Sequence, residues 1–259
     1  EKYGFNKTTC GFCLVGKGGI KWRRMELVYN PKMMKKILLL AVILCSFKGT
    51  WAQSGKITKE LSKFTEVKGY DGLSINLIQS DKNQAIITGS DTDKVTLVNS
   101  DGVLKVRMTL TKMFSGYRTF VDLYHTEALV IIDVNEDARI TCEGAIKQDV
   151  LELRAQEGGE MVIKANVDQF LVRSVSGGVI TATGTSNLQD VAITTGGIYE
   201  GKDFKTKFST VNVNAGSRAT IFATDYVKAS VKAGGEVNVY GNPPKMDEKT
   251  VFGGKINKM

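Results

Sequence analysis

A pair of small residues, almost always two glycines, returns at nearly constant spacing through the second half of the chain. The pairs are Gly158-Gly159, Gly177-Gly178, Gly196-Gly197, Gly216-Ser217, Gly234-Gly235 and Gly253-Gly254. Their first residues are separated by 19, 19, 20, 18 and 19 positions. A repeat close to 20 residues is typical of solenoids, in which each unit contacts only its neighbours and cannot bury its apolar face alone. The repeat therefore restricts this chain to a stacked architecture.

The residues on either side of each pair alternate between apolar and polar. Positions three and five residues before and after the first glycine are mostly apolar; five before it stand Leu153, Val172, Val191, Val211 and Ala229. Alternation with a period of two is typical of β-strands with one buried face, and no sustained helical pattern follows residue 52. We therefore predict an all-β fold, a right-handed parallel β-helix. Its coils of about 18–21 residues would stack about 4.8 Å apart.

Each glycine pair is predicted to mark a corner between two strands. Glycine adopts a positive φ without steric cost, and it lets the backbone of the neighbouring coil pass close by. A glycine-rich phosphate loop is the alternative, but such a loop needs a helix after it, and none is expected here. One coil earlier Asp137 takes the place of the glycine, which turns Ile140 and Cys142 inward. A buried, inert thiol is the expected state of Cys142, and a reactive thiol is the alternative.

Residues 53–259 are expected to form one β-helix domain, in which residues 128–259 are the regular coils. Residues 53–127 show strand patterns without the repeat. The stretch from Leu73 to Ile87 alternates on both sides of a polar turn, and Asp101-Gly102 between the next two alternating runs is a strong hairpin signal. We predict hairpins here, whose wide antiparallel or irregular strands begin the solenoid and form an N-terminal β cap over one end of its core.

Residues 33–52 have the pattern of a secretory signal peptide. Two lysines precede an apolar run over 37–47, and small residues follow, placed for cleavage before Gln53. The run is about half the roughly 20 residues that a membrane-spanning helix needs. A buried core helix and a lipid-modified Cys45 are the alternatives; the bulky Leu44 before the cysteine disfavours the second. After cleavage the chain is not expected to span a membrane, and its expected location is the periplasm, the outer-membrane surface or the medium. Residues 1–32 would be an extension upstream of a true start at Met33 or Met34.

The formal net charge of +8 lies entirely in the first 52 residues. These carry ten of the 35 basic and two of the 27 acidic residues, which leaves 25 of each in 53–259. No basic excess remains there to bind nucleic acid. Residues 53–259 contain one cysteine, Cys142, and one histidine, His125. Neither an intramolecular disulfide nor a site with several His or Cys metal ligands is therefore expected. The Cys10-Gly11-Phe12-Cys13 motif alone is a weak zinc signal. No cofactor and no metal site are predicted.

Residues 111–127 break the strand pattern and concentrate aromatic side chains. Phe114, Tyr117 and Tyr124 accompany Arg118 in this segment. One interpretation is an aromatic cap over the first coil. The other is a protruding loop that binds a ligand, because loops on rigid scaffolds often carry binding sites and an arginine is a forked donor beside aromatic faces that stack on sugars. These four residues are the candidate binding site, and no catalytic residues are predicted.

Several stretches carry a resemblance to a known family: Phe64-Thr-Glu-Val67, Gly72-Leu-Ser-Ile-Asn-Leu77, the repeated Ser/Thr/Ala-Gly-Gly corners and Val239-Tyr240-Gly241-Asn242-Pro243. Over roughly residues 61–256 the chain resembles the head GIN domain family, described as auto-transporter adhesins of bacterial envelopes. Family corners usually read Ser-Gly-Ser-Gly, whereas here they shorten to Ser176-Gly177-Gly178 or Ala215-Gly216-Ser217. The resemblance implies an exported β-helix, and it brings no catalytic motif.

Three functions are compatible with these features. The first is an exported, non-catalytic binding or adhesin-like module of the cell envelope or surface, whose partner is a glycan or an envelope or surface protein. The second is a polysaccharide lyase or glycosidase, which needs paired carboxylates or calcium-binding acids beside a base; four residues after the corner glycines, only Glu200 is acidic. The third is a structural or sensor ectodomain of the envelope. We predict the first. Outward residues available for binding include Thr181, Glu200, Thr220 and Asn238.

Overall fold

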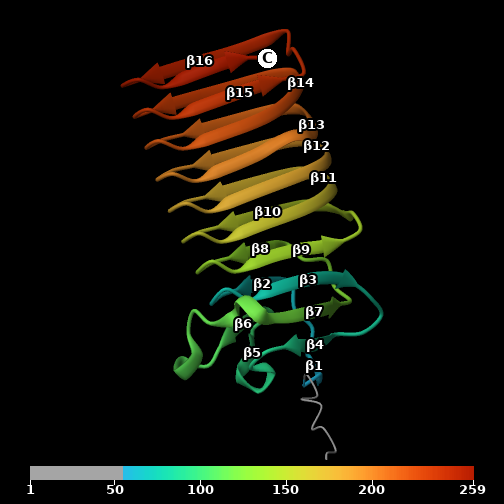
Figure 1. Cartoon of the computed structure of the whole chain (residues 1–259). Helices are drawn as coiled ribbons and strands as arrows, with labels where there is room; N and C mark the ends of the chain where they lie inside the picture. The colour runs from blue at the N-terminus through green and yellow to red at the C-terminus, as the bar shows by residue number, and fades with distance from the viewer. Residues whose placement is uncertain (1–54) are drawn as a thin grey trace, which may run out of the picture. The chain divides into compact units, whose positions relative to one another are not determined.

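The computed structural model describes residues 55–259, which form a column of stacked β coils (Figure 1). The upper part of the column consists of parallel strands, each of which pairs with the equivalent strand of the next coil (Figure 1). These strands are β8 (Ile131–Val134), β9 (Arg139–Glu143), β10 (Ile146–Ala155), β11 (Glu160–Ser174), β12 (Val179–Ile193), β13 (Ile198–Val213), β14 (Arg218–Lys232), β15 (Glu236–Tyr240), β16 (Lys245–Val251) and β17 (Lys255–Lys258). The predicted all-β solenoid of parallel coils is confirmed.

The strand register confirms the predicted apolar columns. Val172 in β11 pairs with Val191 in β12, and Val191 pairs with Val211 in β13. All three side chains are fully buried. Parallel, in-register coils place equivalent residues directly above one another. Each set of equivalent inward residues therefore forms a continuous apolar stack inside the solenoid. The core is therefore one long cluster that runs along the axis.

One inward column contains a glycine, and the structure gives the reason. Tyr199 is completely buried, and a Cβ on Gly201 would overlap its ring. The tyrosine hydroxyl accepts a hydrogen bond from Gln189 Nε2 at 2.7 Å, and Gln189 Oε1 accepts one from Ser209 at 3.1 Å. Burial raises the pKa of Tyr199, so the ring stays neutral. Gly201 thus makes room for a large ring whose polar end is paired inside the core.

The glycine corners are tight turns with two consecutive residues at positive φ. At one corner Ser176 has φ 50° and Gly177 has φ 77°, and Gly178 N–H donates to the Val175 carbonyl at 3.0 Å. This is the geometry of a type I′ turn. The two glycines have different tasks. The first adopts the positive φ and has open space around it, whereas a Cβ on the second would overlap the carbonyl oxygen of Ala155 in the previous coil.

The coil before the first glycine corner follows the predicted register with one difference. Arg139 pairs with Glu160, and Ile140 is fully buried, as expected when Asp137 takes the glycine position. Cys142 is only partly buried at the edge of the core, because the chain leaves the coil at Gly144, two residues later. Burial raises the pKa of the Cys142 thiol, which disfavours the reactive thiolate and agrees with an inert residue.

Regular parallel coils begin earlier in the sequence than predicted. β2 (Glu66–Gly69) and β3 (Ser74–Gln79) form a parallel coil whose corner, Asp71-Gly72, has both φ values positive. This coil pairs with β8 and β9 on one side and with β6 (Val103–Met108) and β7 (Thr119–His125) on the other. The strands before residue 128 begin the solenoid, as predicted, but β2 and β3 form a regular parallel coil rather than antiparallel or irregular strands. The long insertion between β3 and β8 hides the repeat.

The antiparallel cap lies below these coils and is smaller than predicted. β5 (Val95–Ser100) and β6 form the expected hairpin around Asp101-Gly102. β3 and β4 (Gln84–Gly89) do not form a hairpin, because β7 lies between them and pairs with both. β1 (Ile57–Glu60) pairs antiparallel with β4. Three short 3-10 helices complete this end: η1 (Thr92–Lys94), η2 (Leu110–Lys112) and η3 (Gly116–Arg118).

Several predictions concern residues that the structure does not describe. The upstream extension, the signal peptide, Cys10, Cys13 and Cys45 all lie outside residues 55–259. Among residues 55–259, no helix has the length and apolar character needed to cross a membrane.

The last coil has charged residues at two inward positions. The apolar column of Val191, Val211 and Ala229 continues to Glu248, and Lys258 follows Val239 in a second inward column. Lys258 Nζ lies 2.8 Å from the Glu248 carboxylate. This ion pair sits where the next apolar layer would be. Inward-pointing charges on an edge strand disfavour pairing with another sheet, so we expect the ion pair to disfavour pairing at this strand edge.

Replacing both members of this ion pair by valine should make the chain associate end to end. The Glu248→Val/Lys258→Val variant extends two apolar columns to an open strand edge, which favours docking of a second edge. Light scattering after size exclusion should show a larger average mass than for the unchanged chain. Asp247→Val/Lys249→Val is the matched control, because it removes the same charges from outward positions of the same strand. An unchanged mass in both variants would contradict the protective role.

Candidate functional site

The structure brings together only part of the predicted aromatic site. Phe114, Tyr117 and Arg118 lie in the connection between β6 and β7, and all three side chains are exposed. Tyr124 is half-buried near the far end of β7. Since a strand rises about 3.3 Å per residue, Tyr124 lies roughly 20 Å from Tyr117. Tyr124 therefore cannot share a small ligand with the other three.

The connection is held firmly against two corners of the solenoid. The carboxylate of Asp71, which is fully buried, accepts the N–H groups of Met108 at 2.9 Å and Phe114 at 3.2 Å. The Tyr117 hydroxyl donates to Asp137 at 3.1 Å, which raises the pKa of Tyr117. Burial and the neighbouring Asp71 charge raise the pKa of Glu136 beside this clamp. The segment is thus an ordered, hydrogen-bonded loop, which we call the aromatic loop (residues 109–118).

The aromatic loop does not cap the core. Phe114 and Tyr117 are 54% and 56% exposed, whereas Val121 and Leu123 of β7 fill the first layer. We therefore expect Phe114→Ala to lower the free energy of unfolding by about 0.5 kcal/mol or less, and Tyr117→Ala, which also removes the hydrogen bond to Asp137, to lower it by about 1 kcal/mol. Denaturant unfolding would measure this. The buried Phe64→Ala, at 1% exposure, is the control and should cost roughly 3–5 kcal/mol. A similar loss for Phe114→Ala would restore the cap interpretation.

A second candidate surface is the side of the solenoid that precedes each glycine corner. We call it the pre-corner face, made of outward residues two, four, six and eight positions before the first corner glycine. A hollow of about 450 Å³ crosses four coils of this face. Its floor is formed by the short side chains of Ala192, Asn212 and Ser230, with Arg173 at one end and Lys232 at the other.

A narrower groove of about 270 Å³ runs beside this hollow on the same strands. Leu188, Phe208 and Tyr226 stand in register, eight residues before their corners. Leu188 and Phe208 remain 45% and 44% exposed, although they are large and apolar. Sequence reasoning missed this ridge; a signal was present in the run of apolar residues at one outward position in three successive repeats.

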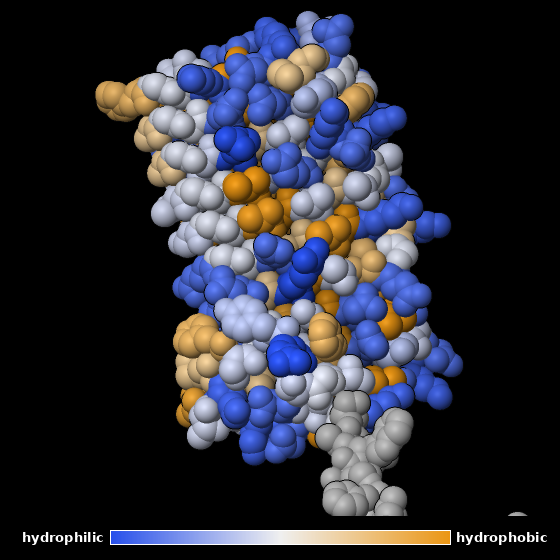
Figure 2. Space-filling model, viewed as in Figure 1, coloured by the Kyte–Doolittle hydropathy of each residue, from blue (hydrophilic) through white to orange (hydrophobic). Residues whose placement is uncertain are grey.

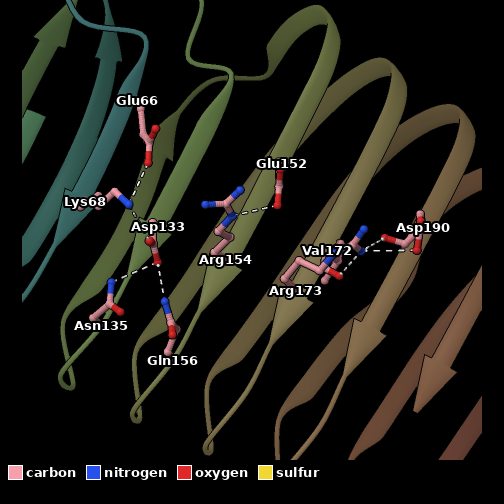
Figure 3. Close-up of polar contacts among 10 residues, drawn as sticks. All are labelled: Glu66, Lys68, Asp133, Asn135, Glu152, Arg154, Gln156, Val172, Arg173 and Asp190. Atoms are coloured by element: carbon pink, nitrogen blue, oxygen red, sulfur yellow. Dashed lines mark hydrogen bonds and ion pairs between the residues drawn. The ribbon is translucent and has the colours of Figure 1, made fainter. Parts of the chain in front are cut away.

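Towards the N-terminal coils the pre-corner face is covered by ion pairs (Figure 3). Lys68 Nζ lies 2.9 Å from Glu66 and 3.5 Å from Asp133, and the Glu66 contact raises the pKa of Lys68. Arg154 Nε lies 2.8 Å from Glu152. In these coils the side chains fill the surface and neutralise one another. The face becomes hollow only beyond the next arginine, where short residues replace the long ones.

Arg173 marks the boundary between the covered and the hollow part of the pre-corner face. Its guanidinium donates to the carbonyl of Val172 and to both the carbonyl and the carboxylate of Asp190, at 3.0 to 3.3 Å (Figure 3). These bonds fix the side chain against its own coil and the next one. The position above it in the same column is Ala192, which opens the floor of the hollow.

The opposite side of the column, after the corners, carries a different pattern. The predicted outward residues Thr181, Glu200, Thr220 and Asn238 stand in register as expected, but Thr220 is buried and is not available to a partner. Asn257 Nδ2 donates to Asn238 at 2.8 Å and to Glu236 at 2.9 Å, so part of this column is internally paired. Figure 2 shows one side of the molecule that is mostly polar, with apolar side chains gathered midway up the column.

The acidic and histidine side chains of residues 55–259 offer no candidate metal centre. Within the part of the chain that the structure describes, no group of three or more His, Cys, Asp or Glu residues could hold a metal ion. The single histidine, His125, is buried and its Nδ1 lies 2.9 Å from the carbonyl oxygen of Glu127. Burial lowers the pKa of His125. The available chemistry is binding through rings, amides, hydroxyls and lysines.

Comparison with known proteins places this architecture in context. Residues 63–243 match the family model described as "Putative auto-transporter adhesin, head GIN domain". A "putative adhesin" from Bacteroides fragilis NCTC 9343 superimposes with a TM-score of 0.71 at 18% identity, covering 80% of this chain and 98% of that one. No curated protein matches the chain.

Two further solved structures share the fold. A "putative adhesin" from Parabacteroides merdae ATCC 43184 has a TM-score of 0.61 at 18% identity over 79% of this chain and 95% of that one. A "Putative lipid binding protein" from Parabacteroides distasonis ATCC 8503 has a TM-score of 0.59 at 15% identity over 80% and 98%. At these identities the likeness extends to the fold only.

Proposed function

The chain belongs to the head GIN domain family, and on that premise we propose that it is an exported, non-catalytic binding module of the cell envelope or surface. Its partner is a glycan or an envelope or surface protein. It acts in the periplasm, on the outer-membrane surface or outside the cell. The signal-peptide pattern of residues 33–52 and the names of the family and of two structural neighbours, all adhesins, support this proposal.

The observation that carries the proposal is the pairing of acids on the pre-corner face. Glu152 is bound by Arg154, Asp133 by Lys68 and Asp190 by Arg173. Glycoside hydrolysis needs two free carboxyl groups on either side of the scissile bond, one of which acts as an acid. None of the side chains that line the hollow carries a carboxyl group. The hollow therefore favours binding over a lyase or glycosidase reaction.

The rigidity of the scaffold also supports binding. The coils are joined by a continuous ladder of backbone hydrogen bonds, and the aromatic loop is clamped by Asp71 and Asp137. Groups held in place before binding lose little conformational entropy when a ligand arrives. The hollow with its adjoining ridge, and separately the aromatic loop, are the two surfaces on which this proposal rests.

The test separates three classes of function with one experiment. The purified protein is incubated with a panel of soluble and immobilised glycans and with isolated cell envelopes. Retention without release of reducing ends or unsaturated products is expected. Product release would identify a polysaccharide-active enzyme and overturn the proposal. A protein retained by neither glycans nor envelopes would also overturn it, in favour of a structural ectodomain.

A further inference from the structure

From the pre-corner face we infer a ligand class: a linear polysaccharide that carries carboxylate groups, bound along the axis of the solenoid. This inference rests on the proposed binding function and makes it specific. Three features carry it: the ridge formed by the exposed Leu188 and Phe208 and the half-buried Tyr226, the hollow beside that ridge, and the lysines at its C-terminal end.

The ridge fits the apolar faces of sugar rings. Large side chains that remain nearly half exposed and lie in a line are uncommon on a soluble surface unless something packs on them. Successive rungs are about 4.8 Å apart because each belongs to the next coil. That spacing is close to the length of one hexose residue in an extended chain. A glycan that lies along the axis can therefore place its rings on successive rungs without changing register.

The floor of the hollow supplies neutral hydrogen-bonding groups beside the ridge. Asn212 and Ser230 stand in the floor, and Thr194 and Asn214 line the corner side. Amides and hydroxyls can both donate and accept, which suits the hydroxyl groups of a sugar. The floor residues are short, so a ring resting on the ridge can extend its hydroxyls into the hollow.

The charge at the C-terminal end of this face selects an acidic chain. Lys228, Lys232 and Lys249 project from neighbouring outward positions of β14 and β16 and are exposed. Within residues 55–259 none of the three forms an ion pair, whereas the acids towards the other end of the face are paired. Asp247 on the same strand accepts the Tyr226 hydroxyl. The lysines are thus free to bind carboxylates of the ligand.

The test compares polygalacturonate with an uncharged β-linked glucan of similar length, by isothermal titration calorimetry at low and at physiological salt. The unchanged protein should bind polygalacturonate more tightly than the glucan, and more weakly as salt rises. Lys228→Glu/Lys232→Glu should weaken binding of polygalacturonate roughly tenfold or more, the effect of losing a charge-assisted hydrogen bond. Phe208→Ala should weaken binding of both glycans.

Lys164→Glu/Lys202→Glu is the control for charge, because these lysines are exposed residues of β11 and β13 that lie after the glycine corners, outside the pre-corner face. It should leave binding unchanged. All variants alter exposed side chains, so unchanged circular dichroism and melting temperature should accompany them.

The outcomes separate this inference from the proposed function. Equal binding of both glycans, or no effect of Lys228→Glu/Lys232→Glu, would overturn the acidic ligand. Loss of polygalacturonate binding in Phe114→Ala or Tyr117→Ala but not in Phe208→Ala would move the site to the aromatic loop and overturn the pre-corner assignment, while a binding module would stand. Failure to bind polygalacturonate, with retention by envelopes in the earlier panel, would overturn the inference alone. Cleavage of polygalacturonate would overturn the proposed function itself.

Discussion

Val191→Asp is expected to prevent folding. Val191 is completely buried between Val172 of the coil below and Val211 of the coil above. An aspartate there would bury a carboxylate with no basic partner in an apolar column, at a cost of several kcal/mol. The total stability of a domain of this size is about 5–15 kcal/mol. The cost also affects every neighbouring layer, because the coils are stabilised only by stacking.

Circular dichroism and thermal unfolding of the purified variant would measure this effect, and Val213→Asp should behave in the same way. The matched control is Asn212→Asp, which places the same residue one position away on the outward side of the same strand. The native chain already carries Asp190 at the outward position next to Val191. A cooperative transition of Val191→Asp near the midpoint of the unchanged protein would mean that the inward column is wrongly assigned.

Gly178→Ala is expected to destabilise the chain far more than Gly177→Ala. A Cβ at position 178 would overlap the backbone carbonyl of Ala155, which belongs to a fixed strand and cannot move without shifting the coil. Overpacking of this kind against backbone costs roughly 3 kcal/mol or more. At position 177 the space is open, and the only cost is the positive φ of 77°, about 1–2 kcal/mol for an L-residue.

Denaturant unfolding of the two variants, side by side, tests the different tasks of the two glycines. Both substitutions add one methyl group to adjacent residues of the same corner, so composition and location are matched. The midpoint of Gly178→Ala should fall clearly below that of Gly177→Ala, with unchanged dependence on denaturant. Equal losses would mean that φ alone governs the corner and that neighbouring coils do not pass as close as the structure places them.

The aromatic loop shows where sequence reasoning about the site ended. Clustering of Phe114, Tyr117, Arg118 and Tyr124 identified an unusual segment, but the residue types were compatible both with an aromatic cap, which was the preferred interpretation, and with a binding loop. The choice depends on Asp71, more than 40 residues away, which clamps the loop on the outside of the column. The strand beneath it, β7, then carries Tyr124 away from Tyr117. Neither the Asp71 contact nor the separation of Tyr124 from Tyr117 can be recognised from the local sequence pattern.

The pre-corner face, too, could be predicted only in part from the sequence. Its columns can be listed from the repeat, and the change from Arg154 and Arg173 to Ala192, Asn212 and Ser230 is visible in the sequence. The sequence does not show that this change produces a hollow, or that a ridge lies beside it, four residues earlier in each coil. Both become visible only when the coils are placed in space. The pairing of Glu152 with Arg154 and of Asp190 with Arg173 likewise depends on side-chain geometry.

By itself the sequence determined the solenoid, the inward columns from Leu153 to Val239 and the position of every glycine corner after residue 155. This was possible because in-register parallel stacking places equivalent positions of successive repeats above one another. The periodicity of the sequence therefore predicts which residues are in contact between coils. Only the tertiary structure decided the order of the first coils, in which β2 and β3 lie between the later β6–β7 and β8–β9. Those pairings join segments that are separated by a long insertion. The free energy that selects them comes from burial against non-local neighbours, and such burial produces no periodic pattern in the sequence.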